Sequence, residues 1–173
     1  MRDIFFLIGA SGVGKTTVAR HLAARSPWSG HAHYFDSIGV PSEETNKREF
    51  GGDWQRWATR RWIADLAERE SPTQLLEGQT RPSFILEAAA QYHGVQVHTV
   101  LLDCRREVRQ YRLEVERKQP ELATNQMQEW AAYLRGQADA LGLPVIDTSD
   151  APIEDVAKAI ESLAGLQGGR GAL

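Results

Sequence analysis

The chain has 173 residues, of which 42% are hydrophobic and 25% are charged, and its formal net charge is −3. This length and balance are typical of one globular domain, and the weakly acidic charge argues against a protein that coats nucleic acid. The single cysteine, Cys104, excludes an internal disulfide and favours a reducing, cytoplasmic setting. No apolar run approaches the ~20 residues of a membrane helix, and we expect no signal peptide before the first strand.

Short apolar segments alternate with helical patterns along the whole chain. The pattern predicts strands over residues 4–8, 32–36, 74–77, 95–102 and 143–146. It predicts helices over residues 15–25, 54–70, 82–93, 105–118, 122–141 and 153–165. The turn-forming residues 37–53 predict a loop with one helical turn, and Asp53 is the expected N-cap of the helix that follows.

Strands that alternate with helices predict βαβ units. We therefore expect a three-layer αβα sandwich around a five-stranded parallel sheet, as one domain over residues 1–167 with a flexible, Gly-rich tail over 168–173. Ligands of such sheets bind beyond the carboxyl ends of the strands. Five residues follow or end the expected strands: Gly9, Asp36, Glu77, Asp103 and Asp147.

The segment after the first expected strand fits G-x-x-x-x-G-K-[ST] at every position, and we call residues 9–16 the P-loop. Glycines let successive backbone N–H groups point at a phosphate, and the following helix adds its positive dipole end. Chance would give this match in well under about 1% of chains of this length. The nucleotide-binding residues predicted here are Gly9, Ser11, Gly12, Val13, Gly14, Lys15 and Thr16.

Within this motif, Lys15 is expected to bridge the β- and γ-phosphates of ATP, and the Thr16 hydroxyl to hold Mg²⁺. Thr17 either contacts the α-phosphate or is only a second threonine of the first helical turn. No NKxD-type guanine reader follows a strand, which argues against a GTPase. The histidines show no metal-ligand spacing with Cys104, so we expect no zinc site.

The P-loop, together with the spare length over residues 37–70 and 105–142, resembles the nucleoside and nucleotide kinase group of P-loop phosphotransferases over roughly residues 3–165. This group includes adenylate, shikimate and gluconate kinases. The chain also resembles small bacterial proteins called AAA-family ATPases. The resemblance implies an acceptor-binding insertion over 37–70 and a phosphate-closing lid over 105–120.

The resemblance also assigns roles to the carboxylates after strands two and three. Asp36 matches the residue that orients or deprotonates the acceptor hydroxyl, a role that a rigid strand-end carboxylate also suits physically; the alternative is a turn cap with Ser37. Glu77 is the third residue of LLEGQTRP, which is similar to the DG-x-P-R stretch of these kinases, with Glu in place of Asp and an extra residue before Arg81. It is expected to reach Mg²⁺ or the acceptor, with Gln79 and Arg81 at the acceptor site. Arg81 is otherwise an ordinary surface residue.

The lid candidate is the basic stretch DCRREVRQYRLEVERKQP. Arg105, Arg109 and Arg112 share one helical face by their spacing, and the family pattern places such arginines on the adenine and the transferred phosphoryl group. We expect Arg105 to bind the nucleotide and Arg109 and Arg112 to be catalytic. Interspersed glutamates leave a salt-bridged, solvated helix as the alternative.

Two further features complete the predicted site. The stretch VIDTSDAP resembles the adenine-holding loop of the same kinases, through Asp147 and Thr148; the alternative is a helix N-cap by Ser149 or Asp150. Trp54 and Trp62 lie on the apolar stripe of their helix and are expected in the core, whereas Trp57 lies beside the stripe and is a candidate to stack on an acceptor.

We therefore expect a Mg²⁺·ATP-dependent phosphotransferase that acts on a hydroxyl or phosphate of a small metabolite or nucleotide. A 5′-hydroxyl polynucleotide kinase is the first alternative, although the acidic net charge disfavours a nucleic acid partner. The second alternative is a nucleotide-dependent switch that hydrolyses ATP and acts through a partner protein. The sequence predicts no membrane contact and leaves the oligomeric state open.

Overall fold

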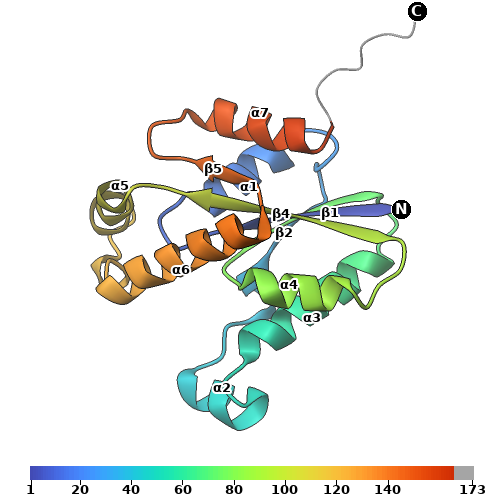
Figure 1. The fold of residues 1–173 in the computed structure, drawn as a ribbon, viewed down its shortest axis with the longest axis horizontal. Helices are drawn as coiled ribbons and strands as arrows, with labels where there is room; N and C mark the ends of the chain where they lie inside the picture. The colour runs from blue at the N-terminus through green and yellow to red at the C-terminus, as the bar shows by residue number, and fades with distance from the viewer. Residues whose placement is uncertain (166–173) are drawn as a thin grey trace, which may run out of the picture.

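In the computed structural model, which describes residues 1–165, five parallel strands form one sheet in the order β2-β3-β1-β4-β5 (Figure 1). The strands are β1 (Arg2–Ile8), β2 (Ala32–Tyr34), β3 (Thr73–Gly78), β4 (Val95–Asp103) and β5 (Val145–Asp147). Every pairing is parallel. The predicted α/β fold is confirmed, while the expected tail over 168–173 lies outside the described residues.

Helices cover both faces of this sheet (Figure 1). One face carries α1 (Lys15–Ala23) and α7 (Ile153–Leu163), and the other carries α3 (Trp54–Glu68), α4 (Pro82–Ala89) and α6 (Asn125–Leu141). In the described part of the chain, no helix is long and apolar enough to cross a membrane.

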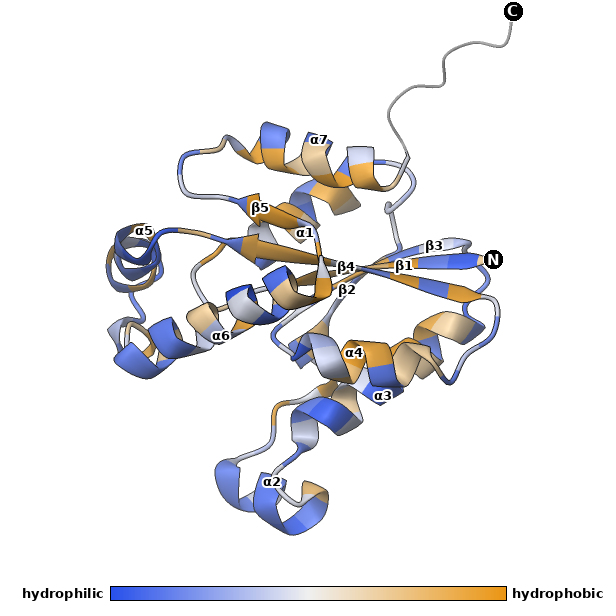
Figure 2. Cartoon of the chain, in the orientation of Figure 1, coloured by the Kyte–Doolittle hydropathy of each residue, from blue (hydrophilic) through white to orange (hydrophobic). Residues whose placement is uncertain are grey.

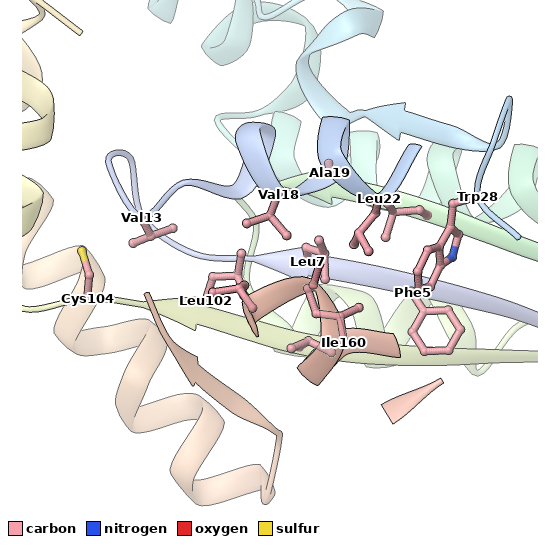
Figure 3. Packing of buried hydrophobic residues seen from close by; sticks show 14 of the residues in the cluster. Phe5, Leu7, Val13, Val18, Ala19, Leu22, Trp28, Leu102, Cys104 and Ile160 are labelled. Atoms are coloured by element: carbon pink, nitrogen blue, oxygen red, sulfur yellow. The ribbon is translucent and has the colours of Figure 1, made fainter. Parts of the chain in front are cut away.

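The central strand β1 explains why the sheet is buried on both sides. Phe5 and Leu7 pack into the cluster under α1 and α7, together with Trp28 (Figure 3). Ile4, Phe6 and Ile8 pack into the opposite cluster under α3, α4 and α6, which includes the predicted core residues Trp54 and Trp62. Because successive side chains of a strand point to opposite faces, a continuous apolar run is what this position requires.

The segment between β2 and α3 contains a helix that the sequence interpretation missed. α2 (Glu43–Phe50) spans two turns, whereas a loop with one turn was expected, so that prediction was wrong. The helix is capped by Ser42, whose Oγ accepts from Thr45 N (3.2 Å), and Gly51 ends it in the left-handed conformation. None of its residues is buried, and it projects from the domain as a hydrophilic arm (Figure 2). Caps and dipole-matched charges therefore stabilise α2 without a buried face.

Helix α3 begins after Asp53 as predicted, but the Asp53 side chain makes no capping hydrogen bond in the described structure. Its place is taken by Asn46 of α2, whose Oδ1 accepts from Trp54 N at 3.0 Å. This bond ties the arm to the helix that follows it.

The sequence predicted one regular helix for the basic segment after β4, but the structure differs. The segment consists of α5 (Arg106–Tyr111) and a π-helical turn, η2 (Arg112–Glu116). A 3₁₀ turn, η3 (Pro120–Leu122), follows, and α6 begins only at Asn125, where the Thr124 hydroxyl caps it by accepting from Met127 N. The expected start of this helix at residue 122 was therefore early by three residues.

The end of β2 also differs from expectation. The strand stops at Tyr34, and residues Phe35–Ile38 form a 3₁₀ helix, η1, which carries Asp36. Phe35 is held from two sides, because its backbone oxygen accepts from Trp62 Nε1 (3.0 Å) and its ring lies edge-on to Trp54. A Cβ on Gly78 would lie 2.2 Å from the Phe35 Cβ. The absence of a side chain at residue 78 is therefore what lets η1 lie against the end of β3.

We predict that Gly78→Ala will destabilise the fold by about 1–3 kcal/mol, the usual cost of overpacking a filled core, because Phe35 must move. Thermal or denaturant unfolding measures this loss. Gly136→Ala is the matched control, because a Cβ at this position in α6 meets open space, and it should stabilise the protein by up to ~1 kcal/mol. Equal stability of the two variants would contradict the close approach of Phe35 to Gly78.

Candidate functional site

The P-loop connects β1 to α1 and packs directly against α5. Gly14 adopts the left-handed conformation (φ 93°) at the N-cap of α1. Gly12 also has positive φ (85°), and a Cβ there would lie 3.0 Å from the side-chain Cγ atoms of Arg109 and Leu113. Glycine at position 12 therefore allows both the turn of the loop and the close approach of the helix that follows β4.

The charged group at the centre of the loop is Lys15, whose Nζ donates to the backbone oxygen of Ala10 at 3.1 Å. Desolvation lowers the pKa of Lys15 from 10.5 to about 8, although the nearby Glu77 and Asp36 carboxylates oppose this shift. An anion at this place would offset the cost of burying the ammonium group.

A hydroxyl and a carboxylate meet beside this lysine. Thr16 Oγ1 donates to Glu77 Oε1 at 3.0 Å, and Glu77 is buried at the end of β3. Burial raises the pKa of Glu77, while the charge of Lys15 and the Thr16 bond lower it. Hydroxyl and carboxylate oxygens are ligands that suit Mg²⁺, so the pair fits the predicted metal role.

Asp36 lies near this group on an exposed turn of η1. Its charge acts on both Lys15 and Glu77, which places the three groups in one electrostatic cluster. Among the described residues, no side-chain hydrogen bond of Asp36 is formed, including with Ser37, so the turn-cap alternative receives no support. The Asp36 carboxylate is free to accept a hydrogen bond from a ligand.

A cavity of about 550 Å³ lies over the P-loop. Seven of the predicted nucleotide-binding residues line it: Gly12, Val13, Gly14, Lys15, Thr16, Thr17 and Thr148. Arg112, which was predicted to be catalytic, lines it as well. Four predicted nucleotide residues do not: Gly9, Ser11, Arg105 and Asp147. At Gly9 a Cβ would lie 2.4 Å from the backbone oxygen of Leu102, so this glycine serves the close packing of β1 against β4.

Thr148 fixes the loop after β5 against the P-loop. Its hydroxyl donates to the backbone oxygen of Val13 at 2.8 Å, and its N–H donates to the oxygen of Asp103 at 2.8 Å. The N-cap alternative for this stretch is wrong, because α7 begins after Pro152 without a side-chain capping bond in the described structure. The Ser149 hydroxyl instead accepts from Arg105 N (2.8 Å).

The three arginines expected on one helical face reach three different places. Arg105 forms an exposed ion pair with Asp150 at 2.5 Å, outside the cavity. Arg109 is buried, and its guanidinium donates to Asp103 (2.9 Å), to the oxygen of Cys104 (2.9 Å) and to Gln128 (2.5 Å). Through these bonds Arg109 joins β4 to α6, and its buried guanidinium is not exposed to a ligand.

Among the arginines of the expected lid, Arg112 and Arg117 line the cavity. Arg112 donates to the backbone oxygen of Thr148 at 2.6 Å, whereas Arg117 makes no side-chain hydrogen bond or ion pair within residues 1–165. The backbone bond from Arg117 N to the oxygen of Arg112 (2.9 Å) spans five residues, as in a π-helix. Such a turn places residues i and i+5 on one face. Regular helical spacing could not reveal this pairing.

A second cavity, of about 570 Å³, is lined by residues of α3, the loop after β3, η3 and α6. Ser11 Oγ donates to Gln79 Oε1 at 3.3 Å, and Gln79 and Arg81 line this cavity, as expected for an acceptor site. The remaining lining residues were missed: Gln55, Glu121, Leu122, Thr124, Gln126, Met127, Glu129, Trp130 and Tyr133. Most of them belong to η3 and α6, where residues 126, 129, 130 and 133 recur at helical spacing.

Trp57, a candidate to stack on an acceptor, does not line this cavity. Its ring lies 5.0 Å from that of Phe50 at the end of α2, and the Arg61 guanidinium lies over it at 5.6 Å. The indole thus joins the arm to α3. Of the predicted insertion over 37–70, Gln55 is the one residue in the lining of the cavity.

The sequence matches no protein-family model and no curated protein. Solved structures do match over nearly the whole chain. A shikimate kinase from Acinetobacter baumannii in complex with shikimate is 20% identical, with 96% of each chain covered and a TM-score of 0.62. A gluconokinase from Sinorhizobium meliloti 1021 is 20% identical, with 96% of this chain and 93% of that chain covered and a TM-score of 0.59.

The chain has the fold of the P-loop small-molecule kinases. A shikimate kinase from Aquifex aeolicus vf5 gives the same result, with 19% identity, 94% and 96% coverage and a TM-score of 0.61. The resemblance stated from the sequence is thereby confirmed for the fold.

The lowered pKa of Lys15 gives a pH prediction. An anionic phosphate favours the charged amine, so binding of ATP should take up a proton once the pH exceeds the free-state pKa of about 8. Affinity should therefore fall with rising pH above about 8, by up to tenfold per pH unit. Calorimetry in buffers of different ionisation enthalpy measures the proton uptake.

Lys15→Arg is the control for this titration, because a guanidinium stays charged throughout the range. Its ATP affinity should change little between pH 7.5 and 9.5. A wild-type affinity that is equally flat would contradict a titrating Lys15.

Proposed function

We propose that the protein is a Mg²⁺·ATP-dependent kinase that phosphorylates a hydroxyl group of a small metabolite. The observation that carries the proposal is the electrostatic cluster of Lys15, Thr16, Glu77 and Asp36, in which Lys15 and Thr16 line the cavity over the P-loop and the carboxylates of Glu77 and Asp36 lie beside them. ATP would supply the phosphoryl group, and Mg²⁺ the charge that its phosphate oxygens need.

The cavity over the P-loop has the donors that a polyphosphate requires. Backbone N–H groups of residues 12–17 and the start of α1 are available to phosphate oxygens. Lys15 adds a charge that is poorly solvated and therefore interacts strongly with an anion. Thr16 and Glu77 would hold the metal ion, Thr16 directly and Glu77 directly or through water.

Asp36 is the group that we assign to the acceptor. Its exposed carboxylate would accept a hydrogen bond from the reacting hydroxyl and take up its proton as the phosphoryl group is transferred. The anchoring of η1 by Phe35 and Trp62 supports this role, because a base must be held at a fixed distance from the reacting oxygen.

On the lid side, we assign the charge-stabilising role to Arg117 and nucleotide binding to Arg112. Arg117 is the one of the two without a protein partner among the described residues, and it acts electrostatically on Lys15. Arg109, predicted as catalytic, becomes a positioning residue in this proposal, because its guanidinium is buried and both of its terminal nitrogens donate to groups at the end of β4 and in α6.

The experiment that tests the function is transfer of label from γ-labelled Mg²⁺·ATP to a panel of hydroxylated sugars, sugar acids, amino compounds, nucleosides, nucleoside monophosphates and 5′-hydroxyl oligonucleotides. Lys15→Ala should lower turnover by about 10²–10³-fold or more, the scale for loss of one preorganised charge. Asp36→Asn should lower transfer far more than ATP binding, and equal loss of both would contradict its role as a base.

The panel also separates the alternatives. Label that enters oligonucleotides alone would favour a polynucleotide kinase. Label that appears only as inorganic phosphate, at the same slow rate with every acceptor, would contradict the kinase proposal and favour a switch that acts through a partner protein.

Arg117→Ala should lower kcat by about 10²–10³-fold with little change in the Kd for ATP, because this arginine is assigned to charge that develops during transfer. Arg106→Ala removes the same charge from the same segment, but Arg106 points to Asn125 and lies outside the cavity. Steady-state kinetics of the two variants should differ by at least tenfold in kcat. Similar kcat values for the two variants would contradict the charge-stabilising role of Arg117.

A further inference from the structure

The second cavity contains charges of both signs that do not neutralise one another. Arg81 comes from the loop after β3, Glu121 from η3 and Glu129 from α6. Within residues 1–165, none of the three forms an ion pair or a side-chain hydrogen bond with another protein group. Side chains of opposite charge that share one cavity but remain apart are available to a ligand that carries both charges.

Aromatic rings hold Arg81 in place. Its guanidinium carbon lies 5.3 Å from the centre of the Phe84 ring, 5.9 Å from Trp130 and 5.8 Å from Tyr133, and the last two rings stack on each other. Cation–π contacts of this kind fix a guanidinium without using its N–H groups. These N–H groups are left for a planar anion, and a carboxylate matches their fork geometry.

The carboxylates favour a cation in the same ligand. Glu121 and Glu129 give the cavity two negative charges against the single positive charge of Arg81. A dianionic phosphate bound to Arg81 would meet net repulsion from this lining, whereas an ammonium group would be attracted to it. The amides of Gln55, Gln79 and Gln126 supply neutral donors and acceptors for hydroxyl groups.

We infer that the acceptor is a zwitterionic polyol: a small hydroxylated compound with a carboxylate, which Arg81 binds, and an ammonium group, which Glu121 and Glu129 attract. The inference rests on the proposed kinase function, which it narrows to one class of acceptor. It assigns specificity to η3, to α6 and to the loop after β3, and not to the projecting arm α2.

The test uses four compounds with one six-carbon skeleton: the cyclic sugars glucose and glucosamine, and the open-chain acids gluconate and 2-amino-2-deoxygluconate, so that the members of each pair differ mainly by the ammonium group. Their Kd values are measured by calorimetry on the full chain, saturated with Mg²⁺ and a non-hydrolysable ATP analogue. The zwitterion should bind most tightly, about tenfold tighter than glucose, because an Arg–carboxylate pair supplies most of the gain. It should bind two- to fivefold tighter than gluconate, the scale of one solvent-exposed charge pair.

Two variants, each of which removes one charge from the cavity, test separately how the carboxylate and the ammonium group of the ligand are bound. Arg81→Gln should weaken the zwitterion and gluconate alike, by about tenfold, and leave glucose and glucosamine unchanged. Glu129→Gln should weaken the zwitterion and glucosamine by about two- to fivefold and strengthen gluconate. Circular dichroism and thermal unfolding establish that both variants fold. The inference is overturned if gluconate or glucose binds as tightly as the zwitterion, or if none of the four binds.

Label transfer separates this inference from the function on which it rests. Transfer from Mg²⁺·ATP to a neutral or purely anionic compound in preference to the zwitterion would keep the kinase function and overturn the charge assignment. Tight, Arg81-dependent binding of the zwitterion without transfer to it would support the charge assignment and contradict the kinase function.

Discussion

The buried guanidinium of Arg109 is the contact on which the geometry of both cavities depends. It joins the end of β4, through Asp103 and the backbone of Cys104, to Gln128 in α6, and its stem lies against the P-loop at Gly12. Loss of one partner of a buried ion pair typically costs about 3–5 kcal/mol, because the other charge stays buried and unpaired. Arg109 therefore holds the P-loop at a fixed distance from α6, which forms one wall of the second cavity.

A second set of bonds adds the remaining strand ends to this frame. Thr148 joins the loop after β5 to Val13 and to the end of β4, and Trp62 joins α3 to η1. The strand ends therefore do not carry functional residues independently. Each is bonded to its neighbour, which suits a site where the acceptor oxygen and the phosphoryl group must meet within a few tenths of an ångström.

How far the sequence predicts this site depends on how local each feature is. The P-loop lies within eight consecutive residues, and β1 must be apolar on both faces because helices cover both, so the position of this loop between a strand and a helix and the burial of β1 were predicted correctly. The arginines of the expected lid were harder to predict. Regular helical spacing puts Arg105, Arg109 and Arg112 on one face, but it does not show which groups of the protein each of them contacts. The π-turn at Arg112–Glu116 then brings Arg117 to the face of Arg112, and no side-chain pattern in the segment signals that extra residue.

The second cavity shows the limit of prediction more sharply, because it is assembled from segments far apart in the chain. Gln55, Arg81, Glu121 and Glu129 come from three helices and the loop after β3, and each alone is an ordinary polar surface residue. A common role in binding is suggested only by their position around one cavity, beside the bond from Ser11 to Gln79.

The two cavities differ in the charge of their lining residues. The first has an unpaired arginine and a poorly solvated lysine, which suit a polyanion, while the second has two carboxylates against one arginine, which disfavour one. This difference would direct a polyphosphate to the P-loop and keep it out of the acceptor cavity, so that the two substrates bind in only one arrangement.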